Sequence, residues 1–177
     1  MAALTMLAFL DDIYGTLFLP HQTLTALKEQ STVWRGALVV ALVNLLEGLR
    51  SGGGTILLQL VTGLGGWYGL CWLLERLGHS LGKEVNLDRV LTLTGFASLP
   101  WLFFAPALNL GGGIGVVCGL AVVLWFVLWQ LKAVAIALEL QIGRVFALIP
   151  LAFAGTVVAF SLLFNGVGLL LTIGDLF

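Results

Sequence analysis

The sequence predicts an all-α membrane protein, a polytopic helical bundle of five transmembrane helices with an amino-terminal interfacial helix. Sixty per cent of its 177 residues are hydrophobic and ten per cent are charged, whereas about 25% of residues are charged in soluble domains. Its apolar runs approach or exceed the roughly 20 residues that a helix needs to cross a bilayer. The net charge of −1 provides no basic field, so nucleic acid is not an expected partner.

Residues 1–31 form the predicted amino-terminal surface segment. A short apolar lead is followed by an expected turn at residues 11–15, and a helix is expected from Pro20 to Gln30. Proline suits a first helical turn. Leu24 and Leu27 share one face of this helix, so it is predicted to be amphipathic and to lie on the membrane surface or on the protein.

The membrane domain is predicted to cover residues 32–177. Its expected spans are approximately 32–50, 55–75, 89–109, 113–138 and 145–172. The first span is the weakest, because only the stretch from Gly36 to Leu46 is free of charged side chains. Snorkelling of Arg35 and Arg50 lengthens it.

The third span carries the clearest local signals. Asn86 is a good helix cap, and Asp88 in the first turn suits the positive end of the helix dipole. Pro100 and Pro106 interrupt the apolar run that follows. Because a proline ring clashes with the carbonyl four residues earlier, a kink is expected near Pro100, with neighbouring helices satisfying the freed carbonyl.

Positive charges predict the orientation, since they favour the cytoplasmic side. With five spans and a cytoplasmic amino terminus, seven basic residues face inward and only Arg50 faces outward. The seven are Lys28, Arg35, Arg76, Lys83, Arg89, Lys132 and Arg144. The carboxyl terminus is therefore expected outside.

Three stretches together carry a family resemblance. The first is GKEVNLDRVLTLTGFASLP, the second is WQLKAVAIALELQIGRVFALIPL, and the third is FLPHQTLTAL near the amino terminus. Their order and spacing resemble the Ypt-interacting-protein (YIP) domain family in its bacterial branch. The matching positions are Gly82, Lys83, Arg89, Gly95, Phe96, Ala97, Pro100 and Arg144. The resemblance implies five spans with the carboxyl terminus outside.

Asn44, Glu47 and Gln59 form a candidate intramembrane polar site. Asn44 and Glu47 are three residues apart and so share a helix face, and Gln59 of the next span is a possible neighbour. An ionisable residue at membrane depth indicates function. The alternative is that Glu47 lies among the outer headgroups, paired with Arg50.

Arg89, Arg144 and Lys83 form a candidate docking site for a cytoplasmic partner or for anionic headgroups. The alternative is a solvated, positively charged rim whose basic residues pair with nearby acids such as Glu139.

Gly111, Gly115 and Gly119 recur every four residues, a spacing that allows close helix packing within one chain or between chains. Together with the break at Pro100, this ladder is the expected packing feature of the domain.

The sequence contains no recognised catalytic motif, and neither a metal nor a cofactor is expected. The predicted function is that of a non-enzymatic scaffold, assembly or accessory subunit in a bacterial cytoplasmic membrane or an internal, thylakoid-type membrane. Expected partners are membrane lipids, other integral membrane proteins or further copies of the chain. The alternative is a small transporter or channel, which Asn44, Glu47, Gln59 and the proline-broken span would support.

Overall fold

The computed structural model describes residues 2–50 and 56–174, with side chains placed for 6–50, 56–159 and 161. The described residues contain helices and no strand. In order, the helices are α1 (Ala2–Phe18), α2 (Pro20–Glu29), α3 (Val33–Arg50), α4 (Ile56–Ser80), α5 (Leu87–Phe96), the 3₁₀ helix η1 (Leu99–Phe103), α6 (Phe104–Leu108), α7 (Gly112–Leu138) and α8 (Ile142–Gly174). Residue 55 of the second predicted span and residues 175–177 lie outside the described part.

The all-helical class is confirmed, and four segments are long and apolar enough to cross a membrane. They are Ile56–Ser80, Leu87–Leu108, Gly112–Leu138 and Ile142–Ala159. The first predicted span forms a helix, α3, but is not among the four. Its eighteen residues include three charged side chains, Arg35, Glu47 and Arg50.

The third predicted span lies at the centre of the fold. Every residue from Val90 to Phe96 in α5 is buried, and α5 contacts α2, α3, α4 and α7. As expected, Asn86 caps the helix, its side chain accepting the Asp88 N–H at 2.8 Å. The predicted break near Pro100 is also confirmed, because α5 ends at Phe96 and the chain continues as η1 and α6.

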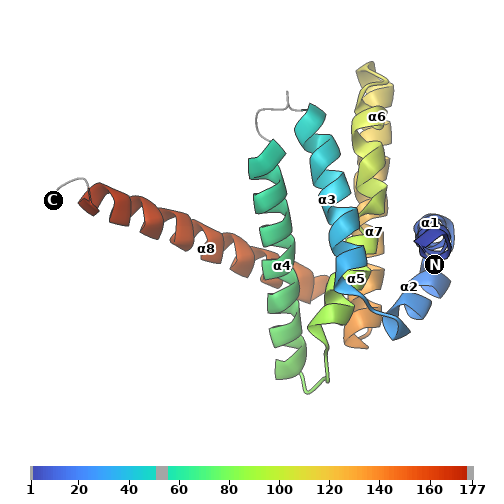
Figure 1. Cartoon of the computed structure of the whole chain (residues 1–177), viewed down its shortest axis with the longest axis horizontal. Helices are drawn as coiled ribbons and strands as arrows, with labels where there is room; N and C mark the ends of the chain where they lie inside the picture. The colour runs from blue at the N-terminus through green and yellow to red at the C-terminus, as the bar shows by residue number, and fades with distance from the viewer. Residues whose placement is uncertain (1, 51–55, 175–177) are drawn as a thin grey trace.

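α3 and α4 pack side by side, and α7, which contacts α5, η1 and α6, runs in a similar direction along the bundle (Figure 1). We call one end of this bundle the Glu139 end. It holds the start of α3, the loop at residues 81–86 and the connection from α7 to α8. The opposite end, which we call the Gly111 end, holds the turn between α6 and α7.

α1 corrects one expectation. It is a continuous helix through residues 11–15, where a turn was predicted. Asp12 pairs with Arg35 of α3, and the Thr16 hydroxyl donates to the Asp12 carbonyl at 2.7 Å. Gly15 lies so close to Thr23 of α2 that no Cβ would fit. The contacts with Arg35 and Thr23, together with the Thr16 hydrogen bond inside α1, outweigh the weak helix propensity of Asp and Gly.

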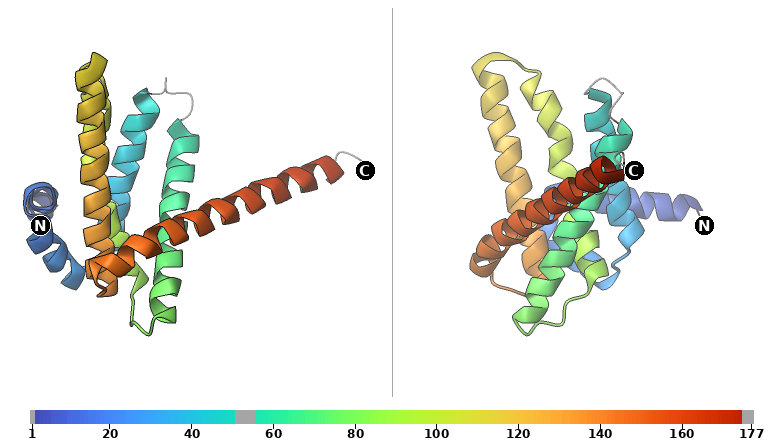
Figure 2. Two further views of the ribbon diagram at one scale, coloured as in Figure 1. Left: turned by 180° about the vertical axis from the view of Figure 1, so that it is seen from behind. Right: turned by 90° about the vertical axis from the view of Figure 1, so that its left-hand side faces the viewer.

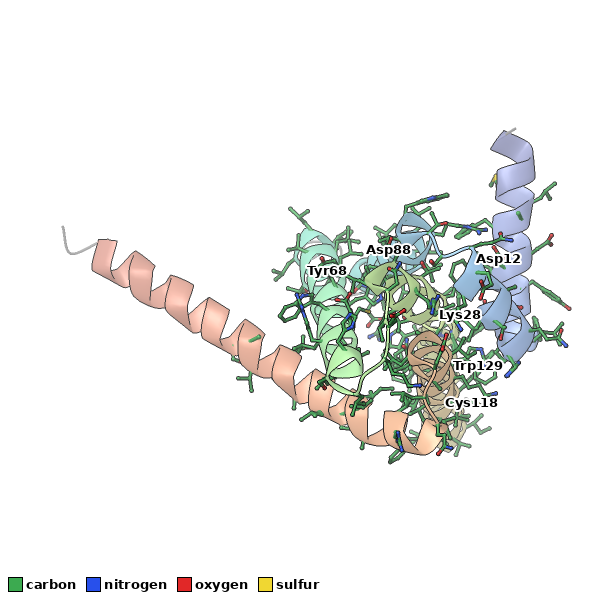
Figure 3. All side chains as sticks on the ribbon, turned by 90° about the horizontal axis from the view of Figure 1, so that it is seen from below. Asp12, Lys28, Tyr68, Asp88, Cys118 and Trp129 are labelled. Carbon is green, nitrogen blue, oxygen red and sulfur yellow. The ribbon has the colours of Figure 1, made fainter. Side chains whose placement is uncertain are left out.

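The predicted helix from Pro20 is confirmed as α2, and Leu24 and Leu27 are both buried on its inner face. α1 lies crosswise to α3, α4 and α7 (Figures 1 and 2). α8 begins against α7 and α4 and then runs away from the bundle, as Figure 2 shows from two sides. Seen from below, α1 and α2 lie on one side of the molecule and α8 extends on the other (Figure 3).

Candidate functional site: a cavity beside the broken helix

The break after α5 leaves a main-chain carbonyl that a second helix satisfies. The Ser98 N–H bonds to the Gly95 carbonyl at 3.1 Å rather than to Thr94 four residues back. The Thr94 carbonyl instead accepts the Ser98 hydroxyl at 3.0 Å and the Gln130 side-chain amide of α7 at 3.1 Å. Gln130 therefore adds a second hydrogen bond at the break, and such a bond contributes about 0.5–1.5 kcal/mol to stability.

The Thr94 side chain links α4 to the break after α5. Its hydroxyl donates to the Val90 carbonyl at 2.7 Å. It therefore accepts from the other two neighbours, the Trp67 indole N–H at 3.0 Å and the Cys71 thiol at 3.1 Å. The residues come from α4 and α5, and with Gln130 from α7 they form one hydrogen-bonded group inside an apolar bundle.

A cavity of about 970 Å³ lies beside this group, between α3, α4, α5, η1, α7 and α8. Its volume is at the upper end of the roughly 300–1,000 Å³ of ligand pockets. The aromatic residues in its wall are Trp67, Trp101, Phe126, Phe146 and Phe153. The polar residues are Asn44, Thr62, Thr94, Ser98, Gln130, Thr156 and Ser161, and none of the described lining residues carries an ionisable group. The cavity can therefore hold an apolar molecule with a small polar end.

The predicted polar site is divided between the cavity and its surroundings. Asn44 lines the cavity and donates from its amide to the Val40 carbonyl at 2.8 Å. Gln59 instead lies against Gly48 at the contact of α3 with α4. Glu47 accepts the Arg50 Nε–H at 3.1 Å, which is the alternative pairing considered from the sequence. Neither Glu47 nor Gln59 is among the described lining residues.

Two of the predicted docking residues, Arg89 and Lys83, lie near the carboxylate of Glu139. Glu139 accepts from Lys28 of α2 at 2.6 Å and lies 3.5 Å from an Arg89 nitrogen. The Lys28 hydrogen bond and charge, followed by the charges of Arg89 and Lys83, lower the pKa of Glu139. Arg144 is exposed and forms no ion pair with any described residue.

Glu139 also ends α7 with a left-handed backbone, at φ 53°. Residues other than glycine rarely adopt this backbone conformation, which costs of the order of 1 kcal/mol. The contacts with α2 and α5 hold it there, so Glu139 ties three helices together at one end of the bundle.

A polar contact that the sequence did not indicate anchors α1. The Trp129 indole N–H donates to the Thr16 carbonyl at 2.6 Å. Arg35, paired with Asp12, also lies over the Phe9 ring, 5.7 Å from its centroid. Burial raises the pKa of Asp12, and the Arg35 charge partly offsets this effect. Trp129 and Arg35 therefore fasten α1 to the bundle.

The glycine ladder performs two different tasks. A Cβ at Gly115 would lie 2.8 Å from the Leu108 carbonyl oxygen, and one at Gly119 would lie 2.9 Å from the Leu108 side chain. Both glycines thus pack against α6 of the same chain. Gly111 differs from the expectation, because an added Cβ would meet nothing within 4 Å. Its φ of 73° serves the turn before α7, where glycine is favoured.

A close approach of two helix backbones involves two glycines that the ladder pattern missed. A Cβ on Gly95 of α5 would lie 2.6 Å from the Gly36 Cα of α3. One on Gly36 would lie 2.7 Å from the Leu91 carbonyl oxygen. Isolated glycines inside two apolar segments were the available signal. Likewise, Gln130 within the fourth apolar run was the available signal for a polar contact beside the cavity.

Comparisons of the chain with protein-family models, curated proteins and solved structures found no match.

Proposed function

We propose that the chain is a non-enzymatic integral membrane protein that acts as a scaffold, assembly or accessory subunit of a membrane complex. Its setting is a bacterial cytoplasmic membrane or an internal, thylakoid-type membrane. Other integral membrane proteins or further copies of the chain are its partners. Membership of the YIP domain family is part of this proposal, supported by the order and spacing of the three stretches described above.

A fifth span, α3, is part of the proposal. Gly36 near the start of α3 lies against Leu91, and Gly48 near its end lies against Ile56, the first residue of α4. α3 therefore follows the length of the bundle, and eighteen helical residues rise about 27 Å. The contact of Lys28 with Glu139 supports placing the residues before α3 on the same side as the end of α7.

We assign the Glu139 end to the cytoplasm and the carboxyl terminus to the outside, on the basis of the seven basic residues against one. α1 and α2 then lie in the cytoplasmic interface. The crosswise direction of α1 supports this placement, as does its bond to Trp129, which lies one helical turn from the charged residue Lys132 of α7.

The observation that carries the scaffold proposal is the exposed apolar surface of α8. This helix leaves the bundle, and its exposed residues include Phe146, Leu151, Phe153 and Val158. Within a membrane, close helix packing rather than hydrophobicity joins chains. A helix that extends from its own bundle offers such packing to a neighbour.

The transporter alternative has one observation in its favour, because a broken helix borders the cavity as in many transporters. The uncharged wall and the pairing of Glu47 with Arg50 outside it favour the scaffold.

Extraction in native lipid followed by mass spectrometry tests the scaffold. We expect a stoichiometric partner chain, or a second copy, to accompany the protein. The double substitution Leu151→Ala and Val158→Ala removes two large apolar side chains from one exposed face of α8. It should therefore release this partner. Leu57→Ala with Val61→Ala is the matched control on the exposed face of α4. Extraction of a single chain without any protein partner would contradict the proposal.

A further inference from the structure

The wall of the cavity has unused hydrogen-bonding capacity at defined atoms. Both N–H groups of the Gln130 amide are engaged, by the Thr94 carbonyl at 3.1 Å and the Ser98 hydroxyl at 3.2 Å. Because a carbonyl can only accept, these bonds fix which end of the amide is nitrogen. The Gln130 carbonyl oxygen accepts no hydrogen bond within the described part of the chain.

Asn44 repeats this arrangement on another wall. Its amide nitrogen donates to the Val40 carbonyl, and its oxygen accepts from no described residue. The hydroxyls of Thr62, Thr94 and Ser98 already donate to main-chain carbonyls. The indole N–H of Trp101 donates to no described residue. The wall therefore offers strong acceptors together with a donor, which a hydroxyl group can satisfy from both sides.

The cavity also selects against charge. No described lining residue is ionisable, and an unpaired charge inside an apolar site carries a large desolvation cost. Four lining residues of α7 and α8, Phe146, Phe153, Val157 and Val127, are themselves exposed. The cavity is thus continuous with a surface that faces lipid in the proposed placement, and a hydrocarbon chain can enter it from the bilayer.

From this geometry we infer that the cavity binds an uncharged, long-chain membrane lipid with a hydroxyl head. The hydroxyl donates to the Gln130 carbonyl oxygen, and the chain lies among the aromatic residues between α7, α8 and α4. This inference goes beyond the scaffold function, and either can hold without the other.

Photolabelling of the full chain in lipid nanodiscs tests the site. Three probes share one straight hydrocarbon chain carrying a diazirine and differ only at the head, as an alcohol, its methyl ether and a quaternary ammonium. The ether cannot donate to Gln130, so loss of one neutral hydrogen bond should weaken labelling about fivefold. The ammonium probe should label the lining peptides weakest. Equal labelling by the alcohol and the ether, or stronger labelling by the ammonium, would overturn the inference.

Two glycines provide a matched pair of variants. Gly66 lines the cavity and an added Cβ there meets nothing within 4 Å, so the side chain of Gly66→Leu can start into the cavity and occupy part of it. Gly143 is equally free but lies outside the cavity. Gly66→Leu should abolish alcohol labelling of the lining peptides, and Gly143→Leu should leave it unchanged. Undiminished labelling of a folded Gly66→Leu protein would show that the lipid binds elsewhere.

Gln130→Leu separates recognition of the head from filling of the cavity. The variant replaces the amide with an apolar side chain and so removes the acceptor. The alcohol and the ether should then label equally. Retention of the full preference for the alcohol in a folded Gln130→Leu protein would refute the hydroxyl contact. If that variant is unstable, the comparison of the alcohol with the ether in the unchanged chain still tests the contact.

Discussion

The contact between α3 and α5 can be tested by adding a single methyl group. In Gly95→Ala the new Cβ would lie 2.6 Å from the Gly36 Cα and 2.7 Å from its carbonyl oxygen. Favourable contacts between carbon atoms lie at about 3.5–4.0 Å, so the helices must separate by about 1 Å. Overpacking costs about 1–3 kcal/mol, and a backbone neighbour cannot rotate away, which places this case near 3.

Alanine also favours the helical state by about 1 kcal/mol relative to glycine. Subtracting this gain of about 1 kcal/mol from the overpacking cost of about 3 kcal/mol leaves a decrease of about 2 kcal/mol in the free energy of unfolding. Unfolding in mixed micelles, followed by tryptophan fluorescence, measures this loss. Gly66→Ala is the control, since its Cβ meets nothing within 4 Å, and it should be neutral or slightly stabilising. If Gly95→Ala is as stable as the control, α3 does not pack on α5 as described.

Three further predictions concern polar and small residues. Glu139→Gln should loosen α2, seen as faster amide exchange. Lys28 lowers the pKa of Glu139, so the stabilising contact is fully present above the ordinary carboxyl pKa of 4.5 and is lost as the pH falls through the lower pKa of the folded protein. Acid should therefore loosen α2 in the unchanged chain and have no such effect in the variant. Gly115→Leu with Gly119→Leu should lower the unfolding free energy by about 3 kcal/mol or more, whereas unchanged stability would mean that these glycines face lipid. Gln130→Leu should cost about 0.5–1.5 kcal/mol, because the Thr94 carbonyl keeps the Ser98 hydroxyl but loses the Gln130 amide, and a neutral effect on thermal unfolding would contradict that hydrogen bond.

Local chemistry explains what the sequence predicted well. Proline lacks an N–H, so the break at Pro100 was visible without knowledge of neighbouring helices. The Asn86 cap and the burial of Leu24 and Leu27 also follow from local residue types and spacing. The helix lengths follow from the long apolar runs.

The contacts that were missed join distant parts of the chain. Asp12 was expected in a turn because Arg35, its partner, lies 23 residues away. Trp129 meets Thr16 across 113 residues. The cavity arises from the arrangement of several helices, so no single apolar segment predicts it. The polar residue Gln130 within an apolar run was a signal, but its partner at the helix break appears only in the fold.

The side of the membrane on which α1 and α2 lie tests the five-span proposal most directly. Cysteines introduced at the exposed residues Gln30, Glu84 and Asn109 can be reacted with an impermeant maleimide in sealed vesicles of known orientation. The unchanged chain measures any reaction of Cys71 and Cys118. We predict that Gln30→Cys and Glu84→Cys react from the cytoplasmic side and Asn109→Cys from the outside. Reaction of Gln30→Cys from the same side as Asn109→Cys would show that α3 does not cross the membrane and would contradict the five-span bundle.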